Sequence, residues 1–131
     1  MRAMQPMALS YPDAAVLCVL NLKSHLDPSV RVSTDLTGWK RPQPSVHVTH
    51  RSSNNDGVVE WFRLQVDVRA ELMDNVYALM DQVRALLAVL PLEDVNVAGV
   101  REYIGAQPVP DADQRPRLML TVDVAVKGAT A

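Results

Sequence analysis

Two segments of alternating apolar and polar residues constrain the fold of this chain more than any other feature. From Trp61 to Glu71 the sequence reads WFRLQVDVRAE, and from Arg117 to Gly128 it reads RLMLTVDVAVKG. Successive side chains of a strand point to opposite faces, so each segment predicts a long strand with one apolar and one polar face. One-sided alternation of this kind is typical of a mainly antiparallel sheet with one covered face.

Two helices are predicted to cover that face. The first follows SYPD, with Ser10 as a cap, and ends near His25 or Leu26. Its apolar face is expected from Val16, Leu17 and Leu20, with Val19 and Cys18 as further candidates. The second has Asp74 or Asn75 as its cap and is stopped by Pro91, with apolar residues at helical spacing between them.

Shorter strands complete the predicted sheet. They lie at 30–34, at 45–51 and at 95–104, where Gly99 suggests an edge strand or a bulge. A polar turn is expected at 52–57, and long loops at 35–45 and 105–116. The element order α-β-β-β-α-β-β predicts a two-layer α+β sandwich. We expect a single domain over residues 1–131, with residues 1–9 as a loose N-terminus.

Composition narrows the classes of function. The 131 residues carry a net charge of -2 and 5% aromatic residues, which disfavours binding of nucleic acid through a basic face. Cys18 is the single cysteine, so no internal disulfide can form, and its apolar surroundings predict a buried, inert thiol. The apolar run from Ala14 to Leu20 is too short to span a bilayer and lacks the flanks of a signal peptide. We expect the protein to be made in the cytoplasm and not to associate with a membrane.

The sequence offers little chemistry. His47 and His50 lie three residues apart on a predicted strand and so point to opposite faces, which argues against a shared metal ion. No phosphate-binding glycine loop or nucleophile elbow is present. Asp67 and Asp123 are best explained as partners of opposite charges on a solvated strand face; the alternative is a carboxylate pair for acid–base catalysis. We expect no enzyme, no metal and no cofactor.

Interaction residues are the remaining candidates. Trp61 falls on the polar side of its strand, where it lies under a loop or anchors a partner. The other candidates come from the two long loops and are chosen for loop length and polarity. The expected interface residues are Trp39, Lys40, Arg41, Trp61, Asp111 and Asp113.

In element order and spacing, the chain resembles the tail terminator (tail-completion) proteins of long-tailed bacteriophages. The segments that carry the resemblance are PDAAVLCVLNL, SVHVTHR, EWFRLQVDVRAE, DNVYALMDQVRALL and PVPDADQRPRLMLTVDVAVKG. The resemblance covers nearly the whole chain and implies a subunit that closes into a ring, usually of six. Such a ring ends polymerisation of the tail tube and contacts the tail tube protein and the head-completion or connector proteins. DNA passes through its lumen without sequence-specific contacts, and the protein resides in the virion at the head-proximal end of the tail.

Two other interpretations stay open. One is another structural role of the same kind: a head–tail connector, neck or minor tail protein. The other is a small α+β ligand-binding domain or enzyme, which would require a pocket lined by Asp67 or Asp123 with a neighbouring base.

Overall fold

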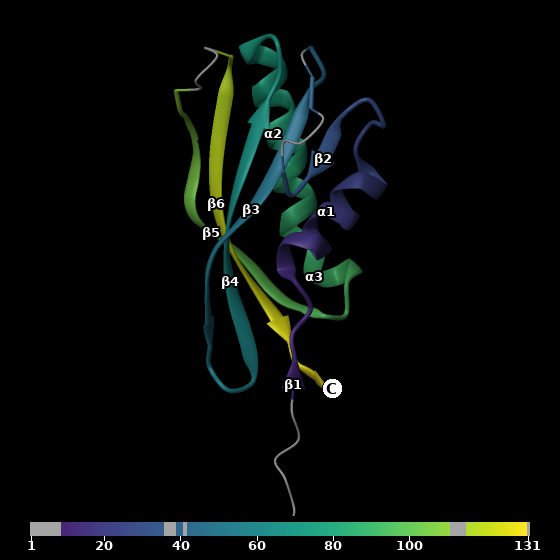
Figure 1. The fold of residues 1–131 in the computed structure, drawn as a ribbon, viewed down its shortest axis with the longest axis vertical. Helices are drawn as coiled ribbons and strands as arrows, with labels where there is room; N and C mark the ends of the chain where they lie inside the picture. The colour runs from purple at the N-terminus through teal and green to yellow at the C-terminus, as the bar shows by residue number, and fades with distance from the viewer. Residues whose placement is uncertain (1–8, 36–38, 41, 111–114, 131) are drawn as a thin grey trace, which may run out of the picture.

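In a computed structural model, a five-stranded sheet is covered on one face by helices, and its other face is open (Figure 1). The structure describes residues 9–35, 39–40, 42–110 and 115–130. The helices are α1 (Ala14–His25), α2 (Met73–Ala88) and the short α3 (Leu90–Glu93). The strand order is β2-β3-β4-β6-β5, with bounds Arg31–Ser33, Ser45–Asn55, Val59–Arg69, Arg117–Lys127 and Val97–Pro108. This arrangement confirms the predicted α+β sandwich.

The two alternating segments are the central strands of the sheet. β4 and β6 pair antiparallel over their whole length, from Val59 opposite Lys127 to Arg69 opposite Arg117. β3 and β5 flank them, also antiparallel, whereas β2 pairs parallel to the first residues of β3. Because the register is regular, all odd-numbered residues of β4 and β6 lie on the open face and the even-numbered ones face the helices.

The core lies between this sheet and the helices. Alternate residues of the central strands are fully or almost fully buried there, among them Leu64, Val66, Leu120 and Val122. On α2, Val76, Leu79, Met80, Val83 and Leu87 form the buried stripe, at the spacing that the sequence predicts.

The predicted apolar face of α1 was wrong at Val16 and Leu20, whereas Cys18 and Val19, the further candidates, are buried as expected. Val16 and Leu20 are 44% and 60% exposed, and the helix buries Ala14, Ala15, Cys18, Val19 and Leu22. Helix α1 is apolar on nearly every side, so residue spacing cannot select the face that packs. The small side chains of Ala14, Ala15 and Cys18 let the helix lie close to the sheet, which favours the observed face.

Several element boundaries also differ from prediction. Helix α1 is capped by Asp13, whose Oδ1 accepts a hydrogen bond from the backbone N–H of Ala15 (2.9 Å), and not by Ser10. Helix α2 begins at Met73 without a side-chain cap, and Pro91 lies within α3 instead of ending α2. Proline lacks a backbone N–H, so it fits the first turn of a short new helix.

The hairpin and the edge strand are longer than predicted. β3 continues to Asn55, so only residues 56–58 form the turn, in which Gly57 has a φ of 96° that glycine tolerates best. β5 extends to Pro108, into the predicted loop 105–116, and the bulge at Gly99 is confirmed by a register shift. A short pair that was not predicted, β1 (Leu9–Ser10) with β7 (Ala129–Thr130), joins the two ends of the chain. Of the predicted loose segment 1–9, only Leu9 is among the described residues.

Candidate interaction surface

The open face of the sheet carries the densest set of polar interactions in the described part of the chain. It is formed by odd-numbered residues of the central strands and their neighbours on β3 and β5. Among the described residues that we group here, four are arginines and two are aspartates, so guanidinium groups outnumber carboxylates within this set. We call this surface, defined by Trp61, Arg63, Gln65, Asp67, Arg69, Arg101, Tyr103, Arg117, Met119, Thr121 and Asp123, the open face.

Asp123 lies at one end of the open face between two guanidinium groups. Arg63 donates from Nε to Oδ1 (2.9 Å) and from Nη2 to Oδ2 (3.2 Å), and Arg101 Nε lies 3.5 Å from Oδ2. Both guanidinium groups also contact an aromatic ring. The Arg63 guanidinium lies 3.5 Å from the Tyr103 ring centroid, and that of Arg101 lies 4.6 Å from the Trp61 ring centroid.

Asp67 forms a second cluster further along β4. Arg117 donates from Nε (2.9 Å) and Nη2 (2.5 Å) to Oδ1, and Gln65 Nε2 donates to Oδ2 (3.0 Å). Asp67 and Asp123 are only 2% and 4% exposed. Arginines are partners of both carboxylates, as the prediction of opposite charges requires, but the two carboxylates are buried instead of solvated. Long arginine side chains fold over the carboxylates and remove them from water.

The position of Asp123 does not favour acid–base catalysis. A cavity of about 230 Å³ opens beside its carboxylate, and its lining consists of Ser52, Ser53, Asn54, Trp61, Arg63, Arg101 and Asp123. The hydrogen bonds from Arg63 lower the pKa of Asp123 below its ordinary value of 3.8 despite partial burial. A carboxylate that stays ionised throughout the neutral range is a weak base and cannot donate a proton there.

The lowered pKa predicts a pH-dependent contribution of Asp123 to stability. Because the folded-state pKa lies below the unfolded value, the stabilisation is complete above pH 3.8 and is lost as the pH falls through the folded pKa. Asp123→Asn should lower the free energy of unfolding by about 2 kcal/mol at pH 7. Urea titrations from neutral to acidic pH should show this difference shrinking below about pH 4. The exposed Lys23→Gln, which also removes one charge, is the control, and an Asp123→Asn deficit that stays constant down to about pH 2 would contradict the assignment.

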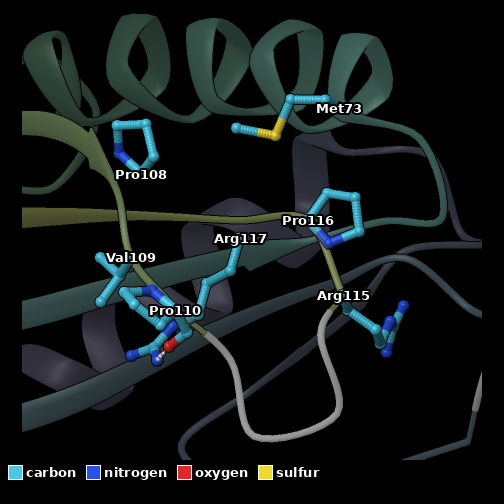
Figure 2. A pocket seen from close by; sticks show the side chains of 7 residues that line it. All are labelled: Met73, Pro108, Val109, Pro110, Arg115, Pro116 and Arg117. Carbon is cyan, nitrogen blue, oxygen red and sulfur yellow. Dashed lines mark hydrogen bonds between the residues drawn. The ribbon is translucent and has the colours of Figure 1, made fainter.

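A second hollow lies beside Arg117, at the start of β6 and away from Asp123 (Figure 2). It measures about 420 Å³ between the end of β5, the start of β6 and the start of α2. It is lined by Met73, Pro108, Val109, Pro110, Arg115, Pro116 and Arg117. At this end Trp39 donates from Nε1 to the carbonyl of Gln43 (3.0 Å), and the Arg115 guanidinium lies 4.0 Å from the Trp39 ring centroid.

The structure separates the predicted interface residues. Trp39 is half-buried against Arg115, and the neighbouring Lys40 is exposed. Trp61 lies on the open face, as its parity predicts, beside the 230 Å³ cavity. From Trp61 to Arg69, at the end of the sheet that holds Trp39, β4 extends about 26 Å at the usual rise. Arg41, Asp111 and Asp113 lie outside the described residues.

Sequence reasoning missed the arginine partners of the open face. Arg63, Arg101 and Arg117 come from three different strands, and Arg63 meets Asp123 because β4 and β6 place them directly opposite each other. The available signal was the parity of charged residues in the two alternating segments. Parity alone does not say which charged residues of the two strands are neighbours, because this also depends on the pairing register. Neither segment encodes that register by itself.

The opposite orientation of His47 and His50 and the burial of Cys18 are confirmed. His47 lies on the open face, opposite Asp67, whereas His50 faces the core side and its ring centroid is 5.6 Å from that of Phe62. No cluster of three or more potential metal ligands occurs among the residues that the structure describes. Cys18 is buried in α1, and burial raises the pKa of its thiol to about 12.

No protein-family model matches the sequence, and no curated protein matches it significantly. The resemblance to tail terminators therefore stays a prediction. Within the described ranges, no helix is long and apolar enough to cross a membrane.

Proposed function

We propose that this chain is a tail terminator subunit of a long-tailed bacteriophage. In this proposal copies of the chain close into a ring, usually of six, that caps the tail tube and ends its polymerisation. The observation that carries the proposal is the open face: a sheet surface of arginines, aromatic rings and aspartates, with no second layer over it within the described residues. Such a surface suits protein contacts better than a reaction, because its titratable groups are already paired.

Self-association is supported by the two-sided construction of the subunit. Helices cover one face of the sheet and the other is free, so the two sides of one subunit differ (Figure 1). A contact between unlike surfaces of neighbouring copies is heterologous, and it forms a closed ring when the rotation between copies closes.

The partners follow from the proposed role. One end of the ring would contact the tail tube protein and the other the head-completion or connector protein. DNA would pass through the lumen without sequence-specific binding. The protein would be made in the host cytoplasm and reside at the head-proximal end of the tail in the virion. Another neck, connector or minor tail protein would differ in its position on the particle.

Molar mass in solution tests the ring. Light scattering over a wide concentration range should show one species at a whole-number multiple of 14.5 kDa that persists on dilution. Addition of the protein to growing tail tubes should then shorten them and place a ring at one end, as seen by negative-stain microscopy. A chain that stays monomeric both alone and with tail tubes would refute the proposal, and a ring at a different site would favour another neck component.

A further inference from the structure

The open face is prepared for a partner of opposite charge. Its guanidinium groups outnumber its carboxylates, and Arg101 is the most accessible of those in ion pairs, with its side chain 67% exposed. The polar cavity of about 230 Å³ beside Arg63 and Arg101 is large enough for the end of an acidic side chain. The Trp61 ring forms part of its wall and supplies an aromatic anchor of the kind that dominates protein contacts.

A complementary surface is present on the other side of the same subunit. The buried stripe of α2 faces the sheet, so the residues on the opposite side of this helix point outward. We call the exposed line of Asp74, Ala78, Asp81, Ala85 and Ala88 the α2 ridge. Its charged residues are both acidic, and the single arginine of α2, Arg84, forms an ion pair with Glu102 on β5 (2.5 Å).

The α2 ridge and the open face also match in shape and length. Alanine side chains at three positions of the ridge allow the helix backbone to approach a flat sheet closely. From Asp74 to Ala88 the ridge extends about 21 Å along the helix. The open face extends about 26 Å along β4 from Trp61 to Arg69. One helix can therefore lie along most of the strand.

We infer that the open face binds the α2 ridge of a second copy of this chain. Asp74 and Asp81 of one copy would pair with the arginines of the open face of the next, with the Arg63–Arg101 cavity as one acceptor. Each subunit carries both surfaces on opposite layers, so the contact repeats head to tail and can close. This inference rests on the proposed function in one respect, that the chain assembles with itself.

Charge exchange between the two surfaces tests the inference. A ridge variant carries Asp74→Arg and Asp81→Arg, and a face variant carries Arg101→Glu. Each should raise the concentration needed for assembly about a hundredfold, because like charges then meet at every contact. An equimolar mixture should recover assembly, since every contact in an alternating ring again joins opposite charges. Such a ring must contain an even number of subunits.

Controls separate this effect from misfolding. Gln82→Arg adds a positive charge to the same helix off the ridge and should assemble like wild type. Ala85→Trp adds bulk on the exposed ridge and should block assembly, whereas Lys23→Trp on the exposed side of α1 should not. The ridge and control variants should keep the wild-type melting temperature within a few degrees, because their changed residues are exposed. Arg101→Glu also loses the ion pair with Asp123, so its folding is checked separately by its own melting temperature.

The outcomes distinguish this inference from the proposed function. If wild type assembles and the ridge variant assembles equally well, the inference is wrong while the ring proposal stands. If both variants fold and fail to assemble but their mixture does not recover, the pairing of these two surfaces is also refuted. A wild type that never assembles, alone or on tail tubes, refutes both.

Discussion

Asp67→Ala should lower the free energy of unfolding by about 3 kcal/mol, one of the largest effects of any polar substitution in this chain. The substitution leaves the Arg117 guanidinium largely buried, with 16% of its side chain exposed, and removes the carboxylate that accepts its hydrogen bonds from Nε and Nη2. Only the hydrogen bond from Nη1 to the carbonyl of Pro110 (3.3 Å) remains. Gln65 loses its partner as well. Equilibrium unfolding in urea, followed by tryptophan fluorescence, measures the loss.

A double substitution identifies the cause of this loss. Asp67→Leu with Arg117→Met replaces the ion pair by apolar side chains of similar volume and should be much more stable than Asp67→Ala. The difference would show that the isolated charge, and not the missing contact, is responsible. If Asp67→Ala alone loses less than about 1 kcal/mol, the pair behaves as an ordinary exposed salt bridge and our account of its burial is wrong.

Preformed ion pairs bear on assembly as well as on stability. In the free subunit the arginines of the Asp67 and Asp123 clusters are already oriented, by the carboxylates and by the rings of Trp61 and Tyr103. Side chains that are held in place before binding lose less conformational entropy when a partner covers them. The two buried aspartates would therefore favour assembly of the proposed ring although they contact no partner themselves.

The sequence was most informative where one residue period dominates. Alternation from Trp61 to Glu71 and from Arg117 to Gly128 predicted both central strands, their buried sides and the covered sheet. Helix α2 was predicted for the same reason, since its apolar residues recur at a single spacing. In each case the apolar side chains have one arrangement that removes them from water, and the local pattern specifies it.

The candidate surface was less predictable because it depends on contacts between strands. The sequence placed Trp61 on the polar side of its strand, but not Arg101 against its ring, because β5 carries register shifts that local patterns do not reveal. The burial of Asp67 and Asp123 depends on arginines from neighbouring strands. Whether a residue has an odd or even position in its strand determines the sheet face on which its side chain lies. Its neighbours on adjacent strands are determined only by the pairing register of those strands.

Helix α1 tests whether the sequence pattern or the observed packing identifies the buried face of a helix. Leu20 and Leu22 lie two residues apart in the same helix, yet they are 60% and 0% exposed. Leu22→Ala should lower the free energy of unfolding by about 3 kcal/mol, through lost burial and the cavity left between α1 and the sheet. Leu20→Ala should change it by less than about 0.5 kcal/mol, since its side chain is largely in water already.

Urea unfolding of both variants decides which face of α1 packs. The face first expected from the sequence, with Val16, Leu17 and Leu20, requires the opposite ranking, because Leu20 would then be in the core. Equal losses would mean that α1 is buried on both sides, for example by a second copy over Leu20. That case is recognised by repeating the measurement at several protein concentrations, because stability gained from assembly rises with concentration whereas stability from the subunit core does not.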